Sequence, residues 1–188
     1  MRQTPRIPPV MPPYSPDVDA ALRAMMPRSS PVEPLKAFRT FMQNPTLAAA
    51  MQPLGRHILG KGRTIDPRDR EILIHRVCAR CGCEYEWGVH ATSLGDRAGL
   101  TLEQLAATVT GGPDAPVWSE RDALLIRLAD ELHDTSHVSD ALWEALAAHW
   151  TPLQLVELLL VVGWYHAIAF LLNGMRVERE EWAATFPG

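Results

Sequence analysis

Apolar and polar positions along this chain follow helical rather than strand periodicity, which predicts an all-α fold. No stretch combines sustained two-residue alternation with β-branched residues, so we expect no β-sheet. Turn residues separate the apolar segments, and GGPDAP at 111–116 is the clearest long loop. Helices are expected at about residues 16–26, 32–43, 45–60, 67–80, 83–98, 102–109, 120–134, 140–149 and 152–174.

The starts of many of these helices share one signal, a side chain that can cap a helix placed directly before a proline. Proline is favoured at the first helical position because its missing N–H would have no partner there. Gly82 and Gly99 predict helix ends, since glycine readily adopts the left-handed conformation that follows a helix. The cap-proline pairs are Ser15-Pro16, Ser30-Pro31, Asn44-Pro45, Asp66-Pro67 and Thr151-Pro152.

The chain divides by composition into an arm and a domain. Residues 1–14 form a proline-rich arm, which we expect to be extended and available to lie over a neighbouring subunit. Residues 15–188 are expected to form a single helical domain.

The last predicted helix is apolar enough to raise the question of a membrane span. Gln154, Glu157 and His166 lie within it, however, and an acidic side chain is costly near the centre of a membrane helix. We therefore interpret it as a helix buried in a core or in a subunit interface. So large an apolar surface in a small domain predicts a homo-oligomer, and no membrane partner.

Composition narrows the function classes further. The 188 residues are 47% apolar and 21% charged, with a net charge of -4 and no basic cluster, which argues against a nucleic-acid partner. Three cysteines crowded into six positions do not form the disulfide framework of a secreted protein. The first residues lack the continuous apolar core of a signal peptide, so we expect a cytoplasmic protein.

Candidate chemistry concentrates between Asp66 and Gly99. In the second predicted helix of this stretch, four residues with reactive or aromatic side chains recur at helical spacing. One helix face therefore carries a thiol, a carboxylate, an indole and an imidazole. These residues are Cys83, Glu86, Trp87 and His90.

This spacing resembles the Glu-x11-Cys-x-x-Cys-x3-His signature of the alkylhydroperoxidase D-like and carboxymuconolactone decarboxylase superfamily. Glu71, Cys83 and His90 occupy three of its positions, and Glu86 stands where the signature has its second cysteine. EYEWGVH, with RAGLT downstream, is similar to a branch labelled carboxymuconolactone decarboxylase. The resemblance runs from about Pro67 to Arg176. It implies an alkylhydroperoxidase D-like helical bundle that forms symmetric dimers, trimers or hexamers.

The resemblance also implies roles for individual residues. His90 would belong to a proton relay, Glu71 would act as its base, and Cys83 would be the catalytic thiol. Glu86 in place of a resolving thiol removes the easy disulfide and adds an acid/base group. Without the resemblance, His90 could be a buried histidine satisfied by a carbonyl, and Glu71 would more often be a solvated residue.

The charges around Cys83 oppose its ionisation. A helix N-terminus acidifies a thiol, but the carboxylates of Glu84 and Glu86 in the same turn outweigh that effect. The cations available to offset these two negative charges are Arg80 and a protonated His90. Cys83 is therefore either a weak nucleophile or a buried apolar thiol.

A metal site is an alternative at the same stretch. Cys78, Cys81 and Cys83, with His75 and His90 nearby, superficially resemble zinc ligands, but no second Cys or His pair follows at finger-like spacing. We expect neither a metal nor a cofactor.

The long last helix supplies candidates for substrate binding. Trp164, His166 and Asn173 could line the far wall of a pocket with Trp87, and a helix whose polar groups bond to neighbours is the alternative. ADELHD at 129–134 reads as an exposed helix end, where His133 suits the helix dipole and needs no function.

Three functions remain open on the sequence alone. The first is an enzyme that uses acid/base chemistry on a small organic acid or lactone, through Glu71, Glu86 and His90. The second is a thiol-dependent hydroperoxide reductase that uses Cys83. The third is a non-catalytic helical module that binds a ligand or partner.

Overall fold

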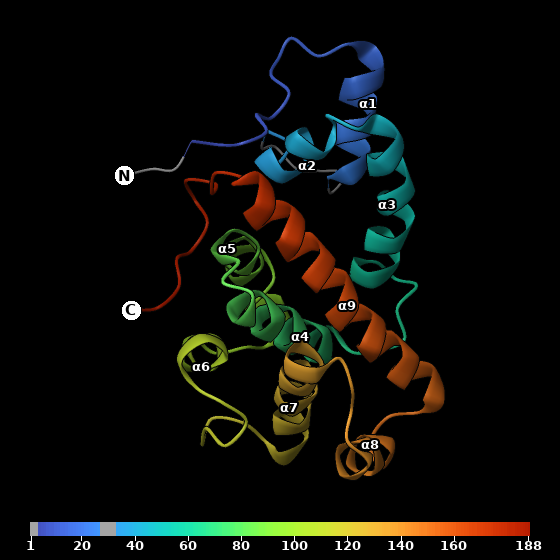
Figure 1. The fold of residues 1–188 in the computed structure, drawn as a ribbon, viewed down its shortest axis with the longest axis vertical. Coiled ribbons are helices and arrows are strands. Elements are labelled where there is room, and N and C mark those ends of the chain that lie inside the picture. Colours follow the sequence, from blue (N-terminus) through green and yellow to red (C-terminus); the bar gives the residue numbers. More distant parts are fainter. Residues whose placement is uncertain (1–3, 27–32) are drawn as a thin grey trace. The chain divides into compact units, whose positions relative to one another are not determined.

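The computed structural model describes residues 4–26 and 33–188, and the described chain is helical without strands (Figure 1). The predicted all-α class is confirmed. The helices are α1 (Pro16–Met25), α2 (Lys36–Phe41), α3 (Pro45–Leu59), α4 (Pro67–Arg80), α5 (Glu84–Ser93), the 3-10 turn η1 (Asp96–Ala98), α6 (Leu102–Thr110), α7 (Glu120–Thr135), α8 (Asp140–Ala147) and α9 (Pro152–Met175).

Most of the expected caps form. The side chains of Ser15 and Asn44 accept hydrogen bonds from backbone N–H groups in the first turns of α1 and α3. Thr151 and Gln154 form the expected capping box, in which each side chain bonds the other's backbone N–H. Asp66 precedes Pro67 without a side-chain cap bond, and the expected cap at Ser30 lies outside the described residues.

Two expected helices differ from those observed. The helix expected at 32–43 is Lys36–Phe41 within the described residues, and its expected first residue, 32, lies outside them. The helix expected at 83–98 ends at Ser93 and continues only as the 3-10 turn, since glycine at Gly95 weakens a helix. Gly82 and Gly99 both have positive φ and end their helices as predicted.

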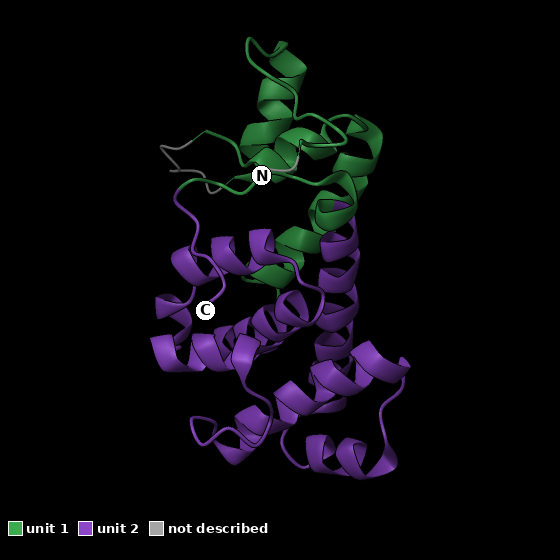
Figure 2. Ribbon diagram, turned by 60° about the vertical axis from the view of Figure 1, so that its left-hand side comes forward, with its two compact units in different colours: residues 1–63, 172–181 green, residues 64–171, 182–188 purple. Residues whose placement is uncertain are grey.

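The chain forms two compact units, which Figure 2 shows in two colours. Unit 1 comprises residues 1–63 and 172–181, and unit 2 comprises residues 64–171 and 182–188. In unit 1, Val10 and Tyr14 of the arm pack against a core that includes Leu22, Met42 and Ala48. The described part of the arm therefore packs within its own chain. A single domain over 15–188 stays a prediction.

Helix α4 is the centre of unit 2 and packs against α5, α6 and α7. Every residue from Asp69 to Cys78 is buried, although five of these ten are charged or histidine. Burying charges on this scale requires partners for them. Helix α7 supplies many of these partners.

A ladder of ion pairs joins α4 to α7. Its pairs are Arg68–Asp122, Arg76–Asp130 and Arg80–Asp134, each 54 residues apart in sequence. A constant offset means that the two helices run side by side in the same direction. Arg76 also donates to the carbonyls of Thr108 and Gly111, which fixes the end of α6.

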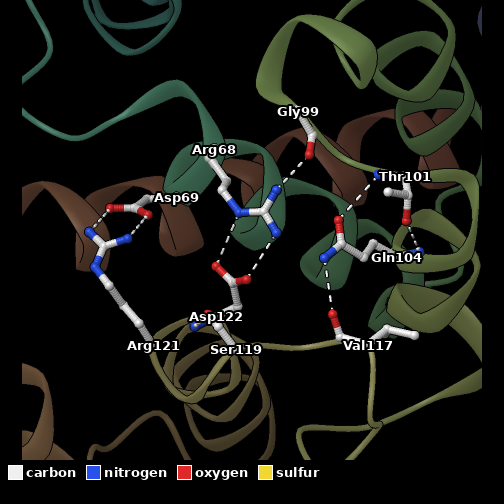
Figure 3. A network of polar contacts seen from close by, with 9 residues as sticks. All are labelled: Arg68, Asp69, Gly99, Thr101, Gln104, Val117, Ser119, Arg121 and Asp122. Atoms are coloured by element: carbon white, nitrogen blue, oxygen red, sulfur yellow. Dashed lines mark hydrogen bonds and ion pairs between the residues drawn. The ribbon is translucent and has the colours of Figure 1, made fainter.

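The first turns of α4 and α7 are held by further polar contacts (Figure 3). Arg121 donates two hydrogen bonds to the Asp69 carboxylate, at 2.5 and 2.6 Å, and Trp150 donates a third at 2.8 Å. Arg68 reaches both Asp122 and the carbonyl of Gly99. Asp69 is thus a buried anchor between helices as well as a first-turn acid.

The C-terminal segment of unit 2 lies along α5. Phe186 packs edge-on against Trp87, and its backbone N–H donates to Glu84. Gly88 allows this close approach, because a Cβ built there would lie 2.1 Å from the carbonyl oxygen of Ala184. Residues 182–188 therefore cover the face of α5 that carries Trp87.

Helix α9 is the one helix in the described chain long and apolar enough to cross a membrane, and half of its most apolar window is buried. This is the pattern of a core helix, as expected from Gln154 and Glu157. Its exposed stripe is apolar, and the homo-oligomer expected from the sequence stays a prediction. The stripe includes Leu153, Val156, Leu160 and Phe170.

Candidate active site in unit 2

Two helices bring Glu71 and His90 together inside unit 2. Glu71 lies in the middle of α4, where its side chain is fully buried. His90 lies on the buried side of α5, which the left-handed turn at Gly82 folds back against α4. The solvated reading of Glu71 is therefore wrong, because the helix that carries it is buried on nearly all sides.

The contact between them is direct. His90 Nδ1 lies 2.8 Å from Glu71 Oε2, which makes a charged hydrogen bond. The other carboxylate oxygen accepts from Arg70, whose Nη2 is 2.6 Å and whose Nε is 2.8 Å away. We call Glu71 and His90 the buried pair. The pair holds Nδ1 of the imidazole against a fixed carboxylate and leaves the Nε2 side of the ring available for proton transfer.

The pair is charged. Burial alone would raise the pKa of Glu71, but the charge and hydrogen bond of His90, aided by Arg70, hold that pKa well below its ordinary value. Burial alone would lower the pKa of His90, but Glu71 and then Glu86 raise it well above its ordinary value. His90 is therefore an imidazolium at neutral pH, and its Nε2 carries a proton.

Two groups face the Nε2 end of His90. Glu86 Oε1 is 3.4 Å away, one helical turn earlier on α5, and its side chain is 15% exposed. Tyr165 of α9 places its hydroxyl oxygen 3.3 Å from the same nitrogen. Burial raises the pKa of Tyr165 well above its ordinary value, so this phenol stays neutral. Glu86 thus lies between the buried imidazolium and solvent.

Cys83 is buried at the N-cap of α5 as a thiol. Burial raises its pKa to about 12; the backbone N–H of Glu86, which donates to the sulfur, lowers it, and the Glu86 carboxylate raises it. Within the described residues the thiol makes no hydrogen bond to Glu71 or His90. Arg80 does not offset the negative charges of Glu84 and Glu86, since it pairs with Asp134 and Asp130.

His75 packs between the pair and Trp87. Its Nδ1 lies 2.7 Å from the carbonyl oxygen of Glu71, so this nitrogen carries the hydrogen. Burial lowers the pKa of His75 to about 4, which keeps the ring neutral. Its Nε2 is buried without a hydrogen-bond partner among the described residues. Because the His75 ring is neutral, the positive charges that contact the Glu71 carboxylate are those of His90 and Arg70.

Trp87 and Trp164, both expected to bind substrate, have different surroundings. Trp87 is buried, donates its indole N–H to Thr108 Oγ1 at 2.9 Å, and supports His75 edge-on. Trp164 borders a shallow groove on α9 with Val156 and Leu160. These two tryptophans serve different surfaces.

His166 and Asn173 belong to different units. His166 is half-buried and contacts His133 of α7, with 2.9 Å between His133 Nδ1 and His166 Nε2. Asn173 is exposed near the end of α9 and belongs to unit 1. The interpretation of 129–134 as an exposed helix end is wrong for Asp130 and His133, because Asp130 pairs with Arg76 and His133 meets His166.

Sequence reasoning missed two residues of the site, Arg70 and Tyr165. Arg70 follows Asp69 in a helix rich in charge, and no spacing signal marks its side chain as buried. Tyr165 comes from α9, 75 residues after His90, so only the packing of that helix brings its hydroxyl to the imidazole.

The opposite pKa shifts of the two histidines predict a dome-shaped dependence of stability on pH. The raised pKa of His90 adds stability that is full below about pH 6.5 and is lost as pH rises above it. The lowered pKa of His75 adds stability that is present above about pH 6.5 and lost as pH falls towards 4. We expect the free energy of unfolding, measured by urea denaturation, to fall by up to about 1.4 kcal/mol per pH unit between pH 7 and 8.5.

The variant His90→Gln separates this effect from that of the cysteines, whose raised pKa values in the folded protein also lower stability as pH approaches the free-thiol pKa of about 8.5. Between pH 7 and 8.5 its unfolding free energy should fall clearly less than that of the unmodified protein. An equal alkaline decline in the variant would show that His90 is not charged in the folded protein.

A family model matches part of this chain. Residues 45–125 match the model of the Carboxymuconolactone decarboxylase family, which is less than half of the chain. The match contains the buried pair, Cys83 and Glu86, whereas Tyr165 lies beyond it.

A curated relative and solved structures resemble the chain over more of its length. The uncharacterized protein YnjA of Escherichia coli K12 is 29% identical over 121 residues, which are 64% of this chain and 65% of that protein, just under two thirds. An uncharacterized peroxidase-related protein from Silicibacter sp. TM1040 superposes with a TM-score of 0.80 at 14% identity, over 98% of this chain and 99% of that chain. The debrominase Bmp8 superposes with a TM-score of 0.73 at 16% identity, over 94% and 92%.

At these identities the solved structures show the fold alone. The helical fold is that of AhpD-like proteins, as the sequence predicts. The family model covers the chain from the start of α3 into α7. The chemistry must therefore be argued from this chain's own side chains.

Proposed function

We propose that this protein is an acid/base enzyme that transfers a proton to a small organic acid or lactone. The buried pair carries this proposal, because it supplies a fixed imidazolium whose Nε2–H faces away from Glu71. An imidazole that is charged before the reaction is a proton donor and a stabiliser of developing negative charge, not a base at rest. An anionic substrate suits such a site.

The carboxylates flanking His90 have separate roles. Glu71 orients the ring through Nδ1 and maintains its charge, held in place by Arg70. Glu86 reaches solvent from the Nε2 side and can return a proton to His90 after each turnover. Tyr165 keeps the ring plane fixed from α9.

Decarboxylation of a carboxymuconolactone shows how bonds, electrons and protons would balance in such a reaction. The carbon–carboxylate bond breaks, carbon dioxide leaves, and the electron pair delocalises into the lactone carbonyl. His90 then donates its Nε2 proton to carbon, and solvent restores it through Glu86. One proton is consumed for each carbon dioxide released. Cys83 forms part of the site wall and is unchanged.

A thiol-dependent hydroperoxide reductase is the second candidate function. It is favoured by Cys83 at the position of the signature cysteine and by fold relatives named as a peroxidase-related protein and a debrominase. The thiol pKa of about 12 and Glu86 at the resolving position oppose it. The acid/base reading is the better supported because its groups are already in contact.

Parallel assays of the unmodified protein and Cys83→Ser separate the two functions. One assay measures carbon dioxide released from carboxymuconolactone, and the other measures loss of cumene hydroperoxide with dithiothreitol. We expect carbon dioxide release to fall less than about tenfold in Cys83→Ser, because the thiol is not consumed. Hydroperoxide loss should be slow and similar in both proteins.

Either of two results would overturn the proposal. Fast hydroperoxide consumption that vanishes with Cys83→Ser would make this a one-cysteine peroxidase. Failure of the unmodified protein to turn over either probe would instead favour the non-catalytic binding module.

A further inference from the structure

A second cluster of reactive side chains lies in unit 2 outside the buried pair. It comes from three elements: Cys81 at the C-cap of α4, His133 in the last turn of α7, and His166 in α9. Their ligand atoms all lie within 4.8 Å of one another. We call these three residues the Cys-His-His cluster. The acid/base proposal uses none of them.

His166 makes a backbone hydrogen bond through Nδ1, which leaves its other ring nitrogen, Nε2, facing the cluster. His166 Nδ1 lies 2.8 Å from the carbonyl oxygen of Val162, which can only accept, so Nδ1 carries the hydrogen. Nε2 therefore presents its lone pair to Cys81 and His133. Metal-binding histidines commonly have this arrangement, in which a backbone carbonyl fixes the ring and its tautomer.

The spacing of the ligand atoms matches that around a tetrahedral ion. With zinc–sulfur bonds of about 2.3 Å and zinc–nitrogen bonds of about 2.0 Å, sulfur and nitrogen lie roughly 3.5 Å apart and two nitrogens about 3.3 Å apart. Here Cys81 Sγ is 3.9 Å and His166 Nε2 is 2.9 Å from His133 Nδ1. These two separations lie within about half an ångström of the expected ones, and the third, between Cys81 Sγ and His166 Nε2, is at most 4.8 Å.

We propose that Cys81, His133 and His166 bind a zinc ion, with solvent in the fourth position. One thiolate and two imidazoles are ligands that zinc favours. All three residues are half-buried, so an ion can reach them from solvent. This proposal stands apart from the proposed enzyme function and replaces the expectation that the chain binds no metal.

Protonation changes accompany binding. His133 Nδ1 now holds the proton it shares with His166 Nε2, and metal ligation moves the ring hydrogen of His133 to Nε2. The Cys81 thiol releases its proton to solvent as zinc binds. The nearby Arg80 is already paired with Asp134, which limits its repulsion of the ion. No oxidation or reduction is involved.

Binding should also stabilise unit 2, because the ion joins the ends of α4 and α7 to α9. A ligand that binds only the folded state raises its stability in proportion to the logarithm of ligand concentration over Kd. A higher melting temperature with added zinc chloride is therefore expected, and chelator should reverse it.

Calorimetric titration of the chelator-treated protein with zinc chloride tests the proposal. We expect one zinc per chain, and a Kd at least about 100-fold weaker in Cys81→Ser and in His166→Gln. His137→Ala serves as the matched control, since this exposed histidine lies outside the cluster, and it should bind as the unmodified protein does. Cobalt(II) added to the unmodified protein should give the near-ultraviolet band of a thiolate–cobalt bond, which needs no variant.

Two results would overturn the site. Stoichiometric zinc binding that survives both substitutions would place the ion elsewhere. A cobalt complex of the unmodified protein without the thiolate band, or no binding of either ion, would show that the Cys-His-His cluster does not ligate metal.

Discussion

Replacing His90 with glutamine should reduce carbon dioxide release from carboxymuconolactone by about 10²–10⁴-fold, the loss typical of a missing proton-transfer group. Glutamine can still hydrogen-bond Glu71, but it carries no charge and has no titratable proton to donate. The loss should appear in kcat more than in KM, because the interaction with His90 strengthens as charge develops.

His149→Gln is the matched control, since that histidine is exposed on the surface after α8. It should keep full activity. If His90→Gln retained more than about a tenth of the activity while folded by circular dichroism, His90 would be a packing residue and the proton would come from another group.

Removing the buried carboxylate should have the largest effect on stability. We expect Glu71→Ala to lower the free energy of unfolding by about 3–5 kcal/mol, as is typical when one partner of a buried charged pair is lost. His90 loses its Nδ1 acceptor, and Arg70 loses the carboxylate that it contacts with two nitrogens. Urea denaturation at pH 7 measures the change.

Glu144→Ala provides the comparison, because Glu144 is exposed on α8. Its effect should stay within about 0.5 kcal/mol. A similarly small effect for Glu71→Ala would mean that the carboxylate is protonated or solvated, and the charged pair would have to be abandoned.

The helices of the fold could be predicted because short sequence signals mark where helices begin and end. Ser15, Asn44 and Thr151 cap their helices directly before proline, and Gly82 ends α4 with a positive φ. Such signals act over a few residues and need no knowledge of packing. The boundaries failed mainly at Gly95, where a weak helix former changes a helix into a 3-10 turn.

The burial of α4 could not be read from its own residues. Helix α4 has the composition of a solvated surface, because it contains Asp69, Arg70, Glu71 and Arg76. These charges can be buried only because groups distant in sequence pair with them. A signal does exist in retrospect. Arginines at 68, 76 and 80 have the same spacing as aspartates at 122, 130 and 134, which predicts two helices paired in register.

The candidate site was predictable only as far as the family signature reaches. Spacing places Cys83, Glu86 and His90 on one helix, and the resemblance joins Glu71 to them. Tyr165 and the Cys-His-His cluster depend on where α9 crosses the unit, which no local pattern specifies. Cys81 was weighed as a metal ligand beside the wrong partners, because its real neighbours lie 52 and 85 positions further along the chain.

The charge on His90 is the central claim of this account, and nitrogen NMR of the imidazole measures it most directly. With histidine labelled by nitrogen-15 and His90→Gln used to assign the signal, both ring nitrogens of His90 should be protonated at pH 8, well above the ordinary pKa of 6.5. A His90 ring that is neutral at pH 7 would contradict the charged buried pair, and with it the proposed proton donor.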